Sequence, residues 1–166
     1  MTQTAVGQEL IISRVFDAPR ELVYRAFTDP DQMAQWFGPV GYSVPRDSIE
    51  IEAQVGGRER FVITCDEDPG RRITIDGTFT EVIENRLLVD FSVSEDSGLP
   101  GTDGILRGTS RLEFHDEEGG KTRIELRAGP FTMETAEDTR LGWKSSFTKL
   151  DAVLSAARLR QERAPF

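Results

Sequence analysis

The chain has 166 residues, of which 37% are hydrophobic and 30% charged, and its formal net charge is −9. This length and composition are typical of one soluble globular domain that buries a core without metal or disulfide support. The acidic excess makes nucleic acids and anionic membranes poor partners, so we expect neither.

The single cysteine, the polar N-terminal residues and the lack of a long apolar run favour a cytoplasmic location. Cys65 is the single cysteine, which excludes a disulfide within the chain and favours a reducing compartment. Residues 1–9 lack the basic and apolar regions of a signal peptide. No apolar run approaches the roughly 20 residues of a membrane span. We therefore expect a cytoplasmic location.

The N-terminal part predicts one strand and two short helices. Leu10–Phe16 is apolar and β-branched, which is typical of a strand. Asp17-Ala18-Pro19 resembles a helix start with an acidic N-cap, and the helix that follows should end at Asp29-Pro30. A second short helix should carry Met33, Trp36 and Phe37 before Gly38-Pro39 stops it.

From about residue 43 to residue 126 the hydrophobic period changes to two, which predicts a meander of antiparallel strands. Apolar residues such as Phe61, Phe79 and Phe91 fall on the expected inward phase. Turn-forming residues separate the strands at 56–57, 68–70, 84–85 and 118–120. We expect a long loop from Ser94 to Gly108, and a bulge or bend at Gly77.

The C-terminal part predicts one long amphipathic helix. Its apolar stripe, at spacings of four, three, four and three, consists of Trp143, Phe147, Leu150, Leu154 and Ala157. The sheet offers the one large apolar face that can bury this stripe. We expect an α+β fold in which a curved antiparallel sheet wraps around the helix, an arrangement that often leaves an apolar space between them. The chain should form a single domain over residues 1–166, with a core from about 10 to 157.

Catalytic machinery is sparse in this sequence. His115 is the single histidine and is expected in a solvated turn, and Cys65 is expected to be a buried structural cysteine. No phosphate loop, nucleophile elbow or metal-ligand cluster is present. We therefore predict no catalytic residue, metal or cofactor, although a single buried acid can serve as a general base. Glu81 is a weak candidate for such an acid.

Aromatic residues from the sheet and the helices carry the strongest functional indication. Apolar pockets with a few polar groups are the usual form of a ligand site. Arg14, Tyr42 and Ser146 are candidate polar groups near such a pocket. The predicted cavity-lining residues are Trp36, Phe37, Phe61, Phe79, Phe91, Trp143, Phe147 and Leu150.

Several segments, taken together, resemble one known family. They are Arg14-x-Phe16-Asp17-Ala18-Pro19-Arg20-Glu21-x-Val23-Tyr24-x-Ala26-x-Thr28-Asp29-Pro30, Trp36-Phe37-Gly38-Pro39, Val55-Gly56-Gly57-Arg58, Gly77-x-Phe79-x-Glu81-Val82 and Gly142-Trp143-x-Ser145-Ser146. This pattern is similar to the family named after the activator of heat-shock protein 90 ATPase, in the START-like (SRPBCC) superfamily. The resemblance implies a helix-grip fold with a cavity under the sheet. The chain departs from the commoner pattern, which has two adjacent tryptophans where Trp36-Phe37 stands.

Three functions remain open at this point. The first is binding of a small hydrophobic molecule in the cavity, which we favour over catalysis. The second, implied by the resemblance alone, is a chaperone-linked module that binds a chaperone as its partner. The third is an enzyme of the cyclase, dehydratase or hydrolase kind that uses an inward-pointing acid with a raised pKa. Either a monomer or a homodimer is compatible with the sequence.

Overall fold

The computed structural model describes residues 8–96 and 105–163. The described elements are, in chain order, β1 (Gln8–Phe16), α1 (Arg20–Thr28), α2 (Pro30–Trp36), β2 (Tyr42–Ser43), the 3₁₀ helix η1 (Arg46–Ser48), β3 (Glu50–Ile51), β4 (Arg58–Cys65), β5 (Arg72–Ile83), β6 (Leu87–Asp96), β7 (Ile105–Glu117), β8 (Lys121–Phe131) and α3 (Met133–Arg163).

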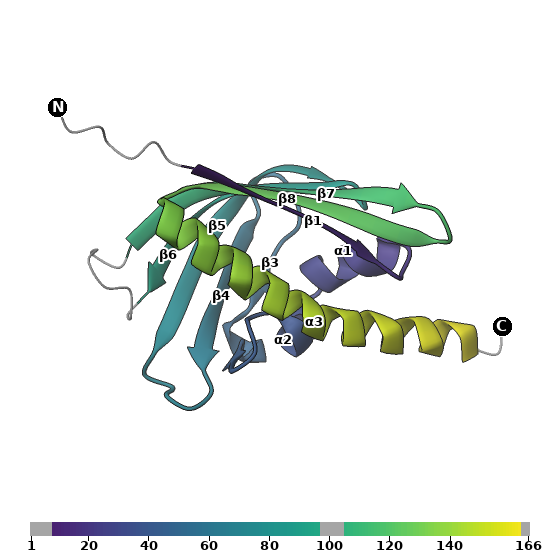
Figure 1. The fold of residues 1–166 in the computed structure, drawn as a ribbon, viewed down its shortest axis with the longest axis horizontal. Coiled ribbons are helices and arrows are strands. Elements are labelled where there is room, and N and C mark those ends of the chain that lie inside the picture. The colour runs from purple at the N-terminus through teal and green to yellow at the C-terminus, as the bar shows by residue number, and fades with distance from the viewer. Residues whose placement is uncertain (1–7, 97–104, 164–166) are drawn as a thin grey trace.

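The strands form one antiparallel sheet that curls around α3. Its order is β1-β8-β7-β6-β5-β4-β2, with β3 paired to β4 beside this path. The long helix crosses the concave side of the sheet, while α1 and α2 lie near one end (Figure 1). This is the helix-grip architecture expected from the sequence, because the concave face is where the apolar stripe of α3 is buried.

The two short helices begin and end close to the expected positions. Asp29 follows the last residue of α1 and caps α2, since its side chain accepts a hydrogen bond of 2.9 Å from the Asp31 backbone N–H. The expected cap at Asp17 is wrong. Pro19 occupies the N-cap position of α1 without a side-chain hydrogen bond, and Asp17 instead pairs with Arg158 of α3.

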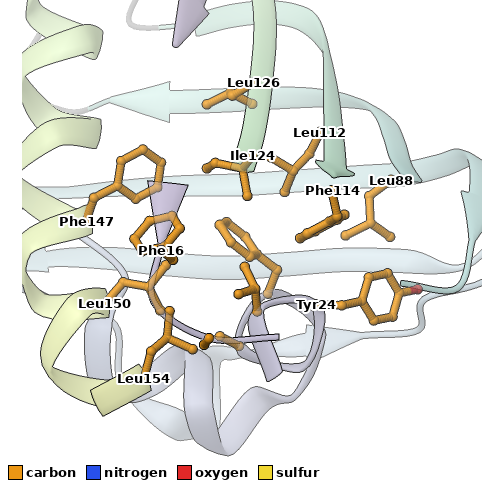
Figure 2. Packing of buried hydrophobic residues seen from close by; sticks show 14 of the residues in the cluster. Phe16, Tyr24, Leu88, Leu112, Phe114, Ile124, Leu126, Phe147, Leu150 and Leu154 are labelled. Atoms are coloured by element: carbon orange, nitrogen blue, oxygen red, sulfur yellow. The ribbon is translucent and has the colours of Figure 1, made fainter. Parts of the chain in front are cut away.

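The packed core lies where β1, β8 and α1 meet α3 from Phe147 onwards. Phe16 and Phe147 pack edge to face, with ring centroids 5.4 Å apart. Leu150 and Leu154 follow at helical spacing and are buried beside them. Figure 2 shows these side chains converging from the helix and the strands. The interlocking apolar side chains fix the position of α3 on the sheet.

The last helix is longer than the sequence predicted. It has 31 residues and begins at Met133, ten positions before Trp143, the first residue of the predicted apolar stripe. Thr132 caps its first turn, because its hydroxyl accepts a hydrogen bond of 3.1 Å from the Thr135 backbone N–H. The added turns carry few apolar residues, so the hydrophobic pattern did not indicate them.

The strands β6 and β7 also extend further than predicted. Residues 94–96 and 105–108 belong to these strands, and β6 pairs with β7 as far as Glu95 opposite Ile105. The rest of the segment where we expected a loop, residues 97–104, lies outside the described residues. His115 lies within β7, and the turn in which we expected it comes three residues later. Among residues 8–96 and 105–163, no helix is both long and apolar enough to cross a membrane.

Candidate functional site

A pocket of about 580 Å³ lies between the concave face of the sheet and the first half of α3. Its apolar walls come from α1, from the end of α2, from the central strands and from α3. Prominent among them are Phe27, Phe37, Phe61, Phe79, Leu126 and Trp143. The volume falls in the range of about 300–1,000 Å³ that is common for small-molecule sites.

Four of the predicted aromatic residues line this pocket together: Phe37, Phe61, Phe79 and Trp143. Phe37 is the central one, since its ring centroid lies 4.8 Å from that of Phe61 and 5.3 Å from that of Trp143. The sheet and the long helix thus meet through an aromatic cluster at one wall of the pocket.

Three other predicted lining residues belong to the packed core instead. Trp36, Phe147 and Leu150 each have an exposed fraction of 0% and are absent from the pocket lining. The Trp36 indole N–H donates a hydrogen bond of 2.9 Å to the Ala26 carbonyl oxygen, which holds the ring between α1 and α2. The sequence pattern marks these residues as inward-facing, but it does not separate a filled core from an open pocket.

The expected inward orientation of Phe91 is wrong. Phe91 is 45% exposed and lies outside the pocket lining, whereas Asp90, Ser92 and Ser94 of the same strand line the pocket. The prediction assumed that the apolar phase of a strand always faces inward. In β6 the more polar phase faces inward, because it forms a pocket wall in that region rather than part of the packed core.

Two acidic side chains from different strands lie together in this pocket. Glu59 of β4 is opposite Gly77 of β5, and Asp90 of β6 is opposite Phe79 of β5. Strand β5 separates the two, so their side chains must meet above it. Gly77 leaves the surface of β5 bare at the position beside Glu59. The sequence analysis did not predict this carboxyl pair.

Gly77 cannot carry a side chain without displacing its neighbours. A Cβ atom there would lie 2.9 Å from the Phe91 carbonyl oxygen and 2.9 Å from the Ser92 Cβ. The bulge expected at this residue lies instead between Phe79 and Glu81, where the register of β5 against β6 shifts. Close approach of β6 is therefore the local reason for glycine at position 77.

The two carboxyl groups of this pair occupy different environments. Asp90 is 8% exposed, and its Oδ1 atom has no hydrogen-bond partner within the described part of the chain. Glu59 is partly exposed, on the pocket that it lines. Burial first, and then the hydrogen bond with Asp90 and the charge of Asp90, raise the pKa of Glu59 well above its usual value. The Glu59 carboxyl group therefore holds a proton to higher pH than an ordinary glutamate would.

The candidate polar residues from the sequence take different positions. Tyr42 and Ser146 line the pocket, and the Ser146 hydroxyl donates a hydrogen bond of 2.9 Å to the Gly142 carbonyl oxygen. Arg14 pairs with Asp151 and lies over the Phe16 and Phe147 rings, outside the pocket lining. Arg14 thus supports the core rather than the candidate site.

Glu81, the acid that the sequence favoured for catalysis, is exposed and lies 3.8 Å from Arg111. Glu59 is the acid that combines an inward position with a raised pKa. The flanking residues Arg58 and Arg60 explain why sequence analysis did not predict an inward position for Glu59. All three positions are charged, so the alternation that reveals an inward face is missing.

A second acidic cluster lies on the other face of the sheet. Glu113, His115 and Glu125 bring their ligand atoms within 4.8 Å of one another. Both carboxylates are already engaged, however, since Glu113 binds Arg111 at 2.8 Å and Glu125 binds Arg127 at 2.8 Å. Hydrogen bonds from Arg111 and then His115 lower the pKa of Glu113. The arrangement is that of ion pairs between residues two positions apart on the same strand, β7 for Glu113 and β8 for Glu125.

The comparison with known sequences decides the family. The sequence model of the family described as "Activator of Hsp90 ATPase homolog 1-like protein" matches residues 17–155. The chain belongs to this family. No functionally curated protein matches this member of the Hsp90 ATPase activator homologue family in sequence.

Solved structures share the fold of this family member. A protein from Chromobacterium violaceum (CV1439) is 24% identical, with a TM-score of 0.75 over 88% of this chain and 96% of its own. The AHSA1 protein of Silicibacter pomeroyi is 23% identical, with a TM-score of 0.75 over 90% and 99%. A protein from Nitrosomonas europaea (NE0264) is 21% identical, with a TM-score of 0.73 over 95% and 99%. These likenesses establish the shared fold.

Proposed function

We propose that this protein binds a small hydrophobic molecule in the pocket between the sheet and α3. The observation that carries the proposal is the aromatic-lined volume of about 580 Å³ described above. Packed protein interiors leave few voids larger than a water molecule, so a space of this size in a domain of 166 residues requires an explanation. A bound apolar ligand accounts both for the space and for the aromatic character of its walls.

The division of α3 supports the same function. Gly142, Trp143 and Ser146 line the pocket, whereas Phe147, Leu150 and Leu154, which follow them along the helix, fill the core. The core holds the helix in place, and the pocket residues are then free to contact a ligand. A chaperone-linked role for this family member stays a prediction of the resemblance.

A variant that fills the pocket tests this function directly. Ser110 of β7 lines the pocket, so Ser110→Phe should occupy part of the ligand space. Thr78→Phe is the matched control, because Thr78 is exposed on β5 and absent from the lining. Native mass spectrometry of freshly purified protein should show an extra mass on the wild type and on Thr78→Phe, and its loss from Ser110→Phe.

Denaturing extraction of the same samples should release the bound molecule for identification. The variant must also remain folded, which a thermal unfolding curve establishes. The same extra mass on Ser110→Phe as on the wild type would place the ligand outside this pocket. Absence of any bound molecule, together with no binding of added apolar probes, would contradict the proposed function.

A further inference from the structure

We infer that the ligand of this pocket is an apolar amine, and that the Glu59 and Asp90 carboxyl groups together bind its ammonium group. This inference rests on the proposed ligand-binding function and adds the chemical class of the ligand. Its basis is the position of the two acids, which lie in the pocket and meet above Gly77.

The first step of the argument is the unsatisfied oxygen of Asp90. Its Oδ1 atom is buried and has no hydrogen-bond partner in residues 8–96 and 105–163. A buried acceptor without a partner is costly, and native structures rarely keep one without a reason. Since Asp90 lines the pocket, an N–H donor on a ligand would supply the missing partner.

The second step concerns charge. Besides the acid pair, the ionisable residues that line the pocket are Tyr42, Arg71, Arg107 and Asp138. Arg107 is opposite Val93, three residues along β6 from Asp90, which is about 10 Å at the usual rise of a strand. Arg71 precedes Gly77 by six positions, about 20 Å along the chain. Both arginines are exposed, and among the residues that the structure describes no other lysine or arginine lines the pocket.

The third step concerns the surroundings of the acid pair. Phe61 lies two positions from Glu59 on the same face of β4, and Phe79 is the cross-strand partner of Asp90. Both rings line the pocket. An ammonium group gains from aromatic faces as well as from carboxylates, and the remaining apolar walls suit a hydrocarbon body. A carboxylic acid ligand would instead meet like charge.

The fourth step is a proton linkage. Without a ligand, burial and the neighbouring Asp90 raise the pKa of Glu59, so its carboxyl group is protonated over a wider pH range than usual. A bound ammonium stabilises the ionised form of Glu59, so amine binding should release a proton. The affinity for an amine should therefore increase with pH, until the amine itself loses its charge.

Three naphthalene probes of nearly equal size separate the effect of ligand charge from that of the apolar body. They are 1-naphthylmethylamine, 1-naphthylmethanol and 1-naphthylacetate. Isothermal titration calorimetry with wild-type protein should rank their affinities as amine, alcohol, acid. The amine should bind at least about tenfold more tightly than the alcohol, as expected for charge-assisted hydrogen bonds. Asp90→Asn should abolish most of this ratio of amine affinity to alcohol affinity. Glu81→Gln, which removes an exposed acid, should leave the ratio as it is.

A wild-type measurement keeps the inference testable if Asp90→Asn does not fold. Titration of the amine in two buffers with different ionisation enthalpies should reveal proton release, and titration of the alcohol should not. Equal affinities for the amine and the alcohol would overturn the amine class while leaving the proposed function intact. Failure of all three probes to bind, or binding that survives Ser110→Phe, would count against both.

Discussion

At the scale of single residues, this protein uses its two tryptophans in different ways. Trp36 is fully buried and its indole N–H is bonded to the Ala26 carbonyl oxygen, whereas Trp143 is partly buried beside the pocket. Both fall on apolar positions of their helices, so the sequence assigned them the same role. The structure makes one a core residue and the other a wall residue.

This difference predicts unequal effects on stability. Trp36→Ala should lower the free energy of unfolding by about 3–5 kcal/mol, because it leaves a cavity in a packed core and an unpaired carbonyl. Trp143→Ala should cost less, about 2 kcal/mol or below, because its ring already borders an open space. Urea unfolding of both variants measures the two values. Equal losses would show that Trp143 belongs to the core after all.

Glu59 predicts a pH dependence of stability. Its folded pKa lies above the unfolded value of about 4.3, so the folded chain binds more protons than the unfolded chain between these values. The free energy of unfolding contributed by Glu59 is therefore fully present below pH 4.3 or so and is lost as pH rises through the folded pKa. Glu59→Gln lacks this loss, and its stability relative to the wild type should increase with pH.

Glu113→Gln provides the opposite case, because the pKa of Glu113 is lowered. The stabilisation that Glu113 contributes is present above the unfolded pKa and is lost as pH falls through the folded pKa. The free energy of unfolding of the wild type should therefore increase relative to that of Glu113→Gln as pH rises. Urea unfolding across an acidic to neutral pH series compares the two. The same slope for both variants would refute the assignment of a raised pKa to Glu59.

At the scale of elements, β5 depends on a bare surface at Gly77. Gly77→Ala should destabilise the protein by about 1–3 kcal/mol, because the added Cβ would contact the Phe91 carbonyl oxygen and the Ser92 Cβ at 2.9 Å. Gly70→Ala is the control, since a Cβ there meets only the Asp68 side chain, at 3.4 Å. Chemical denaturation gives both values. If Gly77→Ala were as stable as Gly70→Ala, the close approach of β6 would not require glycine.

The elements themselves could largely be predicted from the sequence, because strand and helix periods are clear over most of the chain. Errors arose where a segment lacked hydrophobic contrast. The first turns of α3 are polar, and their start depends on a threonine cap rather than on apolar spacing. In β6 both phases contain leucine at their start, Leu87 and Leu88, and both are buried. The pattern therefore could not reveal which phase faces the pocket.

At the scale of the whole molecule, the fold could be predicted and the site only in part. The curved sheet and the long helix follow from periodicity and from the family resemblance. The acid pair does not, because Glu59 lies between two arginines and Asp90 on the polar phase of its strand. Both acids come together only through the curvature of the sheet and the glycine between them. Such long-range proximity is a property of the assembled sheet.

The division of α3 into a segment that lines the pocket and a following segment that fills the core affects how the sequence of this protein can vary. A Cβ at Gly142 would meet nothing within 4 Å, and Ser146 and Trp143 beside it also face the pocket. Substitutions at these positions can alter the shape of the binding space while Phe147, Leu150 and Leu154 keep the helix in place. The shape of the pocket can therefore diverge between related proteins through a few mutations on one segment of a single helix, with the scaffold left intact.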